Sequence, residues 1–361
     1  MSNRFLDLLA NNDGPIVADG GMGTMLMAVG LLFGDPPEQW NVLPEKRTYI
    51  RAIHRGYLDA GAQIILTNTF GGSPFRLKLH NLHGQVFELN RAAAELARAE
   101  AGARVVAGDI GPSGELFEPM GALTYDAAVA GFAAQAAGLA AGGVDLLWIE
   151  TMSDLNEVRA AVAGARQAAP DLPVVATMTF DTRGFTMMGV SPADAVATLV
   201  ELGLAAGGGN CGNGPNEIEG VIHGMRTALG DRRQGIGDRE QGTVDGNSQP
   251  PTSNPQPSTP GFPLIAKSNA GMPEIVDGRA VYSGTPEVMA GYARRVRALG
   301  ADIIGACCGS TPDHIRAMAK ALRELPALSL DEVALASAPA QRQAPGESQR
   351  AREERRARRG A

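Results

Sequence analysis

The chain has 361 residues, of which 44% are hydrophobic and 20% charged. This composition is typical of a soluble globular protein, and the length allows a large buried core. No run of about 18 or more apolar residues is present, so we expect no membrane-spanning helix. The first residues lack the basic and then apolar layout of a signal peptide, and cysteines are few, which favours a reducing, cytoplasmic compartment.

The net charge of −7 is unevenly distributed. The segment from Ser337 onward carries seven arginines and three glutamates, a net +4, and the rest of the chain therefore carries −11. An acidic body argues against nucleic acid as the main partner.

Apolar, β-rich runs alternate with amphipathic stretches along the chain. The runs are apolar throughout, which indicates a parallel sheet covered by helices. Eight strand–helix units predict an α/β fold of the (β/α)8 TIM-barrel type. A doubly wound open sheet is the alternative, but the first strand ends in DGGMGTM, which fails as a GxGxxG phosphate-binding turn. The predicted strands are 15–20, 63–69, 104–111, 145–151, 174–180, 203–210, 263–270 and 302–308.

Two segments do not fit the barrel pattern. Residues 230–262 are rich in Gly, Pro, Ser, Gln and Asn, and they predict a disordered, low-complexity insertion before the seventh strand. The Arg-rich end predicts a disordered or helical extension. We therefore assign 1–328 to the barrel domain, interrupted by 230–262, and 329–361 to a C-terminal extension.

Polar residues gather at the carboxyl ends of the predicted strands. These ends form one mouth in a TIM barrel, where active sites lie. Asp19 precedes Gly20 and Gly21 and also fits a turn cap, and Glu150 also fits a buried pair with an arginine. Two carboxylates beside cysteines nevertheless favour an amino-acid site. The residues at the mouth are Asp19, Gly20, Gly21, Thr67, Asn68, Thr69, Asp109, Glu150, Thr151, Thr179, Asn210, Cys211, Asn269, Cys307 and Cys308.

All three cysteines lie at strand ends. Cys211 ends the sixth strand, and Cys307 and Cys308 end the eighth, which is a near neighbour of the sixth in a barrel. Three converging thiolates suit Zn²⁺, and three protein ligands leave a fourth position open, as in catalytic sites. The structural alternative is three small buried side chains. Their common position favours the metal, and none of the five histidines is assigned to it.

A zinc ion with three thiolate ligands is a weak Lewis acid, so activation of water is a poor fit. Such an ion can hold a substrate thiol as a thiolate at neutral pH. The sequence therefore predicts attack of a bound sulfur on an electrophilic carbon, that is, S-alkylation.

Several segments make the sequence similar to a known family, the zinc-dependent homocysteine S-methyltransferases. They are VADGGMGTML, DAGAQIILTNTFGG, GDIGPSGE, WIETMSDLNEV, ATMTFDTRGFTMMG, NCGNGP, IAKSNAGMP and GACCGSTPDHI, and they span about residues 14–325. The resemblance extends to bacterial betaine–homocysteine methyltransferases and to the homocysteine module of cobalamin-dependent methionine synthase. It implies that 1–328 is a homocysteine-binding catalytic domain, in which Cys211, Cys307 and Cys308 ligate Zn²⁺. It also implies that Asp19, Gly20, Gly21, Glu150 and Asn269 bind homocysteine.

The resemblance leaves three methyl donors open. Betaine, our first choice, needs an aromatic cage. Trp40, Phe70 and Phe75 are the candidates, with Phe33 nearby, although Phe70-Gly71 stands where animal betaine enzymes carry Phe-Tyr. The second donor is a separate methyl-corrinoid protein, because the chain has no DxHxxG cobalamin segment. The third is S-methylmethionine. We expect no requirement for S-adenosylmethionine, nucleotide or flavin.

The rival hypothesis is a non-catalytic barrel that binds zinc and an amino acid, since a fold does not determine a function. Homo-oligomerisation is common among such enzymes, and no residue of the sequence decides it.

Overall fold

The computed structural model describes residues 3–181, 183–230, 261–276 and 279–337. The chain divides into two compact units, Met1–Ala327 and Leu328–Ala361. Residues 231–260 of the predicted insertion and the tail from 338 lie outside the described residues, so both remain predictions. The assignment of 1–328 and 329–361 as domains also remains a prediction. In the second unit, the described residues form one helix, α12 (Leu330–Ser337).

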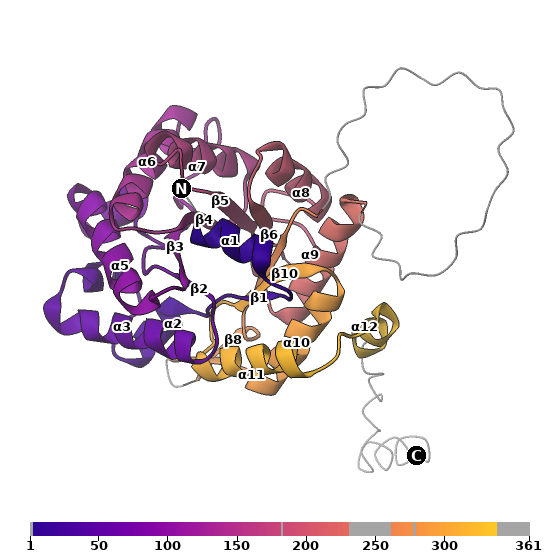
Figure 1. The fold of residues 1–361 in the computed structure, drawn as a ribbon. Helices are drawn as coiled ribbons and strands as arrows, with labels where there is room; N and C mark the ends of the chain where they lie inside the picture. Colours follow the sequence, from indigo (N-terminus) through magenta and orange to yellow (C-terminus); the bar gives the residue numbers. More distant parts are fainter. Residues whose placement is uncertain (1–2, 182, 231–260, 277–278, 338–361) are drawn as a thin grey trace, which may run out of the picture. The chain divides into compact units, whose positions relative to one another are not determined.

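The first unit is built on eight parallel strands in the order β1-β10-β7-β6-β5-β4-β3-β2. A bridge between Ala18 and Ile64 joins the two outermost strands, and this contact closes the sheet into a barrel (Figure 1). The predicted TIM barrel is thereby confirmed. The barrel strands are β1 (Ile16–Val17), β2 (Ile64–Leu66), β3 (Val105–Ile110), β4 (Leu146–Met152), β5 (Val174–Met178), β6 (Ala206–Cys211), β7 (Leu264–Ser268) and β10 (Ala301–Ala306).

Helices surround the barrel and connect consecutive strands (Figure 1). No described helix combines the length and apolar character needed to cross a membrane. The α-helices of this unit are α1 (Arg4–Asn11), α2 (Met22–Ala28), α3 (Pro44–Asp59), α4 (Pro74–Leu77), α5 (Val86–Ala101), α6 (Tyr125–Ala141), α7 (Leu155–Ala168), α8 (Pro192–Glu201), α9 (Pro215–Ala228), α10 (Pro286–Ala298) and α11 (Pro312–Glu324). Short 3-10 helices are η1 (Pro37–Asn41), η2 (Lys78–His80) and η3 (His83–Gln85).

The structure corrects the sequence-based elements in two places. An antiparallel hairpin, β8 (Pro273–Val276) and β9 (Arg279–Tyr282), follows β7 and was not predicted, so the eighth barrel strand is β10. The sixth strand begins at Ala206 rather than at 203. Gly203 has a φ of +63°, and this left-handed residue ends the turn after α8 before the strand can begin.

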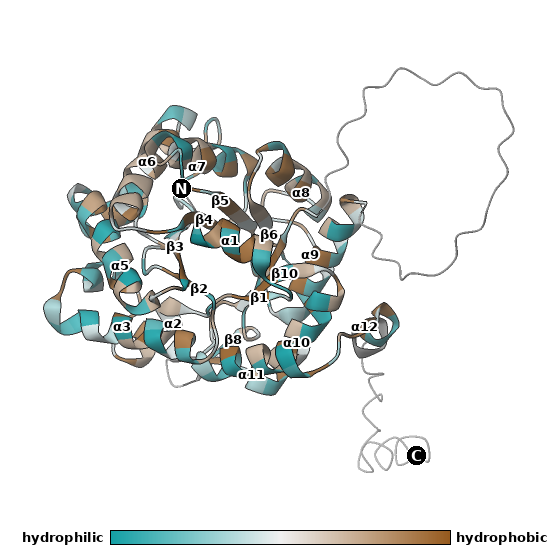
Figure 2. Cartoon of the chain, viewed as in Figure 1, coloured by the Kyte–Doolittle hydropathy of each residue, from teal (hydrophilic) through white to brown (hydrophobic). Residues whose placement is uncertain are grey.

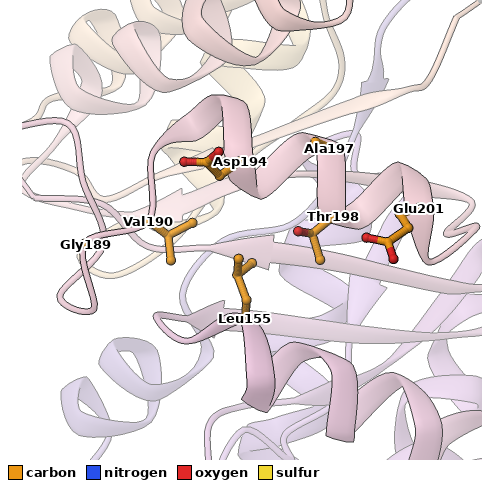
Figure 3. Close-up of a pocket in the computed structure, with 7 residues that line it drawn as sticks. All are labelled: Leu155, Gly189, Val190, Asp194, Ala197, Thr198 and Glu201. Atoms are coloured by element: carbon orange, nitrogen blue, oxygen red, sulfur yellow. The ribbon is translucent and has the colours of Figure 1, made fainter.

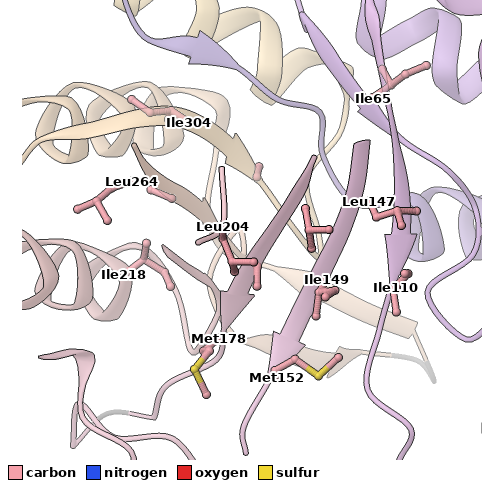
Figure 4. Close-up of a cluster of buried hydrophobic side chains, with 14 of the residues drawn as sticks. Ile65, Ile110, Leu147, Ile149, Met152, Met178, Leu204, Ile218, Leu264 and Ile304 are labelled. Atoms are coloured by element: carbon pink, nitrogen blue, oxygen red, sulfur yellow. The ribbon is translucent and has the colours of Figure 1, made fainter. Parts of the chain in front are cut away.

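Side chains on alternate positions of each strand enter two different cores. The outward set, such as Ile65, Leu147 and Ile304, packs against the helices (Figure 4). The helices carry both hydrophobic and hydrophilic colour in Figure 2, as amphipathic helices do. The inward set fills the barrel with a separate apolar cluster that includes Ile16, Leu66, Trp148, Val175 and Ile265.

Helix α1 lies across one end of the barrel (Figure 1). Its N-cap Asn3 accepts hydrogen bonds from the Phe5 and Leu6 amides, and the Asn3 amide group donates to the carbonyl of Asp145 at 2.8 Å. Because Asp145 directly precedes β4, this is the amino-terminal end of the strands. Phe5 is fully buried and belongs to the inward cluster. The open mouth is therefore at the opposite, carboxyl-terminal end.

Candidate metal centre and the buried charges beneath it

The three cysteine sulfurs lie together at the carboxyl-terminal mouth. Cys211 is the last residue of β6, and Cys307 and Cys308 follow β10. Strand β7 pairs with both of these strands, so Ser268 stands between Cys211 on one side and Ala306 on the other. The three sulfurs lie within 4.8 Å of one another, with Cys211 Sγ 3.0 Å from Cys307 Sγ, and all three cysteines are free. The predicted convergence of the three thiols is thus present in the structure.

This donor set fits a zinc ion. Tetrahedral ligation with Zn–S bonds of about 2.3 Å separates sulfurs by roughly 3.8 Å. This lies between the 3.0 Å that separates Cys211 Sγ from Cys307 Sγ and the 4.8 Å within which all three sulfurs lie. Hydrogen bonds from Cys211 and Cys307 lower the pKa of Cys308 to about 4, whereas a hydrogen bond with Cys307 raises the pKa of Cys211. One thiol therefore ionises readily and the next does not, so a bound cation is needed to keep all three ionised together.

Asn269 ties the two cysteine segments to each other. Its side-chain oxygen accepts a hydrogen bond from the Cys308 amide at 3.0 Å, and its side-chain nitrogen donates to the carbonyl of Gly212 at 2.7 Å. Both ends of the side chain are thus used within the protein. The arrangement fixes the distance between the loop after β6 and the loop after β10.

Gly20 and Gly21 pack directly on the loop that carries Cys307. A Cβ atom on Gly20 would lie 2.4 Å from Ser310 Oγ, and one on Gly21 would lie 2.7 Å from the Cys307 carbonyl oxygen. The Gly21 amide donates to Ser310 Oγ at 3.0 Å, and the buried Tyr57 hydroxyl donates to the Gly21 carbonyl at 3.0 Å. The Gly-Gly pair is therefore required by close backbone approach.

Backbone strain marks the same mouth. Thr151 and Cys211 have φ values of +62° and +61°, a left-handed conformation that is unfavourable for β-branched and most other non-glycine residues. The fully buried Asn210 supports them, since its side-chain oxygen accepts from the Thr151 amide at 2.9 Å and its nitrogen donates to Thr151 Oγ1 at 2.7 Å. Strain of this kind concentrates at functional sites.

Beneath the cysteines, the interior of the barrel changes from apolar to ionic. Every second residue of a strand points into the barrel. On β3 the inward residues Val105 and Ala107 are followed by Asp109, and on β4 Leu146 and Trp148 are followed by Glu150. On β7 the inward Ile265 is followed by Lys267. Lys267 Nζ lies 3.2 Å from Asp19 Oδ1 and 4.0 Å from Glu150 Oε2. We call Asp19, Asp109, Glu150 and Lys267 the ionic layer, and each of the four is at most 7% exposed.

Three acids and one base share this buried layer, and their pKa values reflect the imbalance. Burial raises the pKa of Asp19 and raises that of Glu150 to about 8, in both cases against the opposing charge of Lys267. Burial and the neighbouring Glu150 charge raise the pKa of Asp109 well above its ordinary value. Burial lowers the pKa of Lys267, but Asp19 and Glu150 outweigh it and the net pKa is raised, so Lys267 is charged at neutral pH.

Two residues near the centre were missed by the sequence interpretation. Lys267 lies inside the predicted seventh strand, but the sequence analysis gave it no role. A lysine inside an apolar strand indicates a buried ion pair. Tyr282, on the hairpin that was not predicted, lies over Gly309, where a Cβ would be 2.1 Å from the ring. The sequence analysis considered a buried arginine as the ion-pair partner of Glu150. In the structure that partner is Lys267.

The predicted donor-pocket aromatics do not form one cluster of rings among the described residues. Trp40 is 6% exposed, lies 5.8 Å from the ring of Tyr49 and carries Lys46 Nζ 4.3 Å above its own ring. Phe75 packs edge-on against Phe132 at 6.1 Å. Phe70 is partly exposed and lies close to Gly111, and Phe33 is almost fully exposed. Their role in donor binding remains a proposal.

Other candidate features lie apart from the cysteines. A pocket between the start of α7 and α8 is lined by Leu155, Gly189, Val190, Asp194, Ala197, Thr198 and Glu201, none of which was predicted to act (Figure 3). The metal-ligating group found within the described residues contains no histidine. His314 is 9% exposed and completes the capping box of α11 with Thr311.

Three converging thiols over a buried ionic layer define a class of barrels with a candidate metal site. Comparison with known proteins specifies the family. The profile described as homocysteine S-methyltransferase matches residues 16–322. The chain therefore belongs to the homocysteine S-methyltransferase family.

Two curated relatives are methionine synthases. The chain is 30% identical over 338 residues to that of Mycobacterium tuberculosis, which covers 89% of this chain and 25% of the relative. It is 30% identical over 324 residues to that of Mycobacterium leprae, which covers 85% of this chain and 24% of the relative. The chain thus spans about a quarter of the length of these relatives.

Solved structures share the fold. The homocysteine methyltransferase MmuM from Escherichia coli, in its oxidised form, matches with a TM-score of 0.66 at 24% identity, over 88% of this chain and 99% of that one. Its metallated form matches with a TM-score of 0.65 at 24% identity and the same coverage. A methyltransferase from Methanosarcina mazei matches with a TM-score of 0.53 at 10% identity, over 89% and 97% of the two chains.

Proposed function

We propose that this chain transfers a methyl group to the sulfur of homocysteine and so forms methionine. The observation that carries the proposal is the placement of three free thiols directly at the mouth, above a buried layer with an excess of carboxylates. Family membership and the methionine synthase relatives support it. An amino acid with a thiol on its side chain would present its ammonium to the acids and its sulfur to the cysteines.

Cys211, Cys307 and Cys308 would hold Zn²⁺. When bound there, the ion would stabilise the homocysteine sulfur as a thiolate at neutral pH. The solved relative in a metallated form is consistent with this assignment. Asn269 holds the two cysteine segments at a fixed separation, and it would thereby preserve the geometry of the three thiols.

The remaining predicted residues would hold homocysteine. Glu150 Oε2 is buried and receives no hydrogen bond from the described residues, so it is available to the substrate ammonium. Gly20 and Gly21 would act through the close packing that they allow against Ser310 and the Cys307 loop, which positions that loop beside the substrate. Asp19 is already bonded within the protein, and it would act by fixing Lys267. Asn269 would help to bind the amino acid indirectly, because it determines the shape of the loop that contacts the substrate.

Transfer requires no proton from the protein. The thiolate sulfur forms a bond to the methyl carbon, the bond between that carbon and the donor breaks, and the donor keeps the electron pair. The nitrogen of a trimethylammonium donor leaves as a neutral tertiary amine, and the sulfur of a sulfonium donor leaves as a neutral thioether. Positioning of sulfur and methyl group in line should therefore dominate over acid–base catalysis.

Betaine is the donor that we propose first, on the resemblance to bacterial betaine enzymes. Phe70 is the candidate aromatic side chain that is partly exposed beside the mouth, and it would supply a face for the trimethylammonium group. Trp40 would contribute to donor binding only by shaping the loop before α3, because Lys46 covers its ring.

A methyl group carried by a separate corrinoid protein is the second candidate donor. The segments that follow β1, β2, β3, β5 and β7 carry large apolar side chains that are exposed, and such side chains favour contact with another protein. The methionine synthase relatives are also about four times longer than the segment that matches this chain. The exposed side chains are Leu32, Phe33, Phe70, Leu116, Met120, Phe185, Met187, Met188 and Met272.

A donor screen on protein of measured zinc content tests the proposal. Zinc-loaded protein is incubated with homocysteine and with betaine, S-methylmethionine or methylcobalamin, and methionine is measured. Methionine formed with one donor and lost on chelation supports the transferase. Zinc and homocysteine binding without methionine from any donor would favour the non-catalytic barrel.

A further inference from the structure

The loop that carries Cys307 and Cys308 leads directly into helix α11, and a histidine of that helix is bonded at both ring nitrogens. The Thr311 amide donates to His314 Nδ1 at 3.1 Å, and His314 Nε2 lies 2.7 Å from the Gly284 carbonyl oxygen. An amide nitrogen can only donate and a carbonyl oxygen can only accept, so the ring proton is on Nε2. The neutral imidazole therefore bridges the cysteine loop and the segment after β9.

The segment that receives this bridge is itself bonded to Cys308. The Gly284 amide donates to the Ala270 carbonyl at 2.8 Å, and the Ala270 amide donates to the Cys308 carbonyl at 2.9 Å. With the two bonds of His314, these contacts form a ring that begins and ends on the cysteine loop. We call its members, Cys308, Ala270, Gly284, His314 and Thr311, the clasp.

Close packing leaves the clasp little room to move. A Cβ atom on Gly284 would lie 2.7 Å from the carbonyl carbon and oxygen of Ala270, so the approach of the two backbones requires glycine. Tyr282, two residues before Gly284, packs its ring on Gly309 of the cysteine loop. Burial, and then the charge of Cys308, raise the pKa of Tyr282 to about 12. The hairpin end is thus packed on the loop that the clasp holds.

The backbone of Cys308 is the point on which the clasp acts. Its amide donates to Asn269 Oδ1 at 3.0 Å, and its carbonyl accepts from the next residue, Ala270. Both polar groups of this peptide segment are therefore fixed by two consecutive residues after β7. Gly284 and His314 hold Ala270 from the other side. A change at His314 can consequently reach Cys308 without any contact between the two side chains.

We propose that His314 is a positioning residue for the cysteine loop, because its Nε2–H acts through Gly284 and Ala270 to hold Cys308 close to the other two thiols. The consequence for a bound zinc ion rests on the proposed function. Asn269 acts on Cys308 by direct contact, whereas His314 acts through the clasp. Opening the clasp should leave α11 folded, loosen Cys308 and speed the release of zinc.

Two substitutions of His314 separate the helix cap from the bridge. Glutamine offers an oxygen to the Thr311 amide and an N–H to the Gly284 carbonyl, so it can replace both bonds. Glutamate keeps the capping acceptor but has no donor for Gly284. We expect His314→Gln to release zinc at a rate within about twofold of the wild type, and His314→Glu to release it at least about fivefold faster.

Zinc release from the full, zinc-loaded chain into a chromogenic chelator is followed over time, and hydrogen exchange reports on the Ala270 and Gly284 amides. In His314→Glu both amides should exchange at least about tenfold faster, while amides inside α11 keep the wild-type rate. His223→Glu, the same change at an exposed histidine of α9, is the control and should alter neither readout. Faster exchange throughout α11 in His314→Glu would overturn the positioning role in favour of a helix cap.

Gly284→Ala opens the clasp at its other end and leaves His314 in place. Its Cβ would press on Ala270, whereas the control Gly220→Ala adds a Cβ with nothing within 4 Å. Gly284→Ala should also release zinc at least about fivefold faster. Because both substitutions act on one path, the double variant with His314→Glu should be no more than about twofold faster than the faster single variant, whereas independent effects would multiply.

Three results would overturn the proposal. They are wild-type zinc release in His314→Glu, release from His314→Gln as fast as from His314→Glu, and multiplied effects in the double variant. If the wild-type chain takes up no zinc, the metal site of the proposed function fails. The exchange of the Ala270 and Gly284 amides then decides the clasp by itself, since unchanged exchange in His314→Glu refutes it and faster exchange supports it.

Discussion

The two ends of the barrel interior obey opposite rules. Near α1 the interior is apolar, filled by Phe5, Trp148 and their neighbours, and it is closed to ligands. Near the mouth the same strands present the ionic layer and then three thiols. The first region gains from burial itself, whereas the second buries groups at a cost that the proposed metal ion and substrate would offset. Stability and function are therefore separated along one axis of the fold.

The largest expected effect comes from removing a sulfur at the mouth. Cys308→Ala should lose zinc and reduce methyl transfer by roughly 1000-fold or more, because two thiols hold the ion poorly. Zinc content and methionine formation are measured on the same sample. Ser329→Ala, directly before α12 in the second compact unit, is the control. Retention of both zinc and activity by Cys308→Ala would refute the ligand assignment.

A substitution at the closed end of the barrel, near α1, should change the stability of the protein and leave ligand binding unaffected. Phe5 is fully buried, and Phe5→Ala should lower the free energy of unfolding by about 3–5 kcal/mol through lost burial and a cavity. Denaturant unfolding of the two proteins measures the difference. The affinity of the folded protein for homocysteine should stay within about twofold. A large loss of affinity would show that the two regions are not independent.

The tie between the cysteine segments should show an intermediate effect. Asn269→Ala removes two hydrogen bonds that hold the loops after β6 and β10 together, and zinc affinity should fall about 10- to 100-fold. Competition with a chromogenic chelator measures that affinity. Asn269→Asp keeps the oxygen that accepts from the Cys308 amide, so this variant should retain part of the zinc affinity. Equal zinc affinity in all three proteins would contradict the role of Asn269.

The smallest effect concerns pH. The pKa of Glu150 is raised to about 8 in the ligand-free site, whereas an ammonium group binds the ionised form. Binding must then release a proton below pH 8, so affinity rises with pH, by at most tenfold per unit, and levels off above about 8. Calorimetry with L-methionine, whose sulfur does not titrate, measures this. In Glu150→Gln the affinity for L-methionine should no longer rise with pH. If the affinity of that variant still rises with pH, another titrating group is responsible.

The sequence predicted the barrel well because its signals are local. Apolar runs, glycine-ended helices and polar strand ends each depend on a few adjacent residues, and together they predict eight strands and a mouth. Cys211, Cys307 and Cys308 could be placed at that mouth because the end of a strand fixes which end of the barrel it faces. The hairpin β8–β9 was missed, since two short strands are easily taken for a loop.

What the sequence by itself determined is therefore the fold class, the family resemblance and the presence of three thiols at one end. Only the tertiary structure decided which charges meet. The pairing of Lys267 with Asp19 links residues 248 positions apart. The approach of Lys267 to Glu150 likewise depends on what strands β4 and β7 bring together. The separation of Trp40 and Phe75 into different ring pairs has the same cause. Strand periodicity fixes the direction of a side chain, whereas its partner is fixed by the order and register of strands far away in the chain.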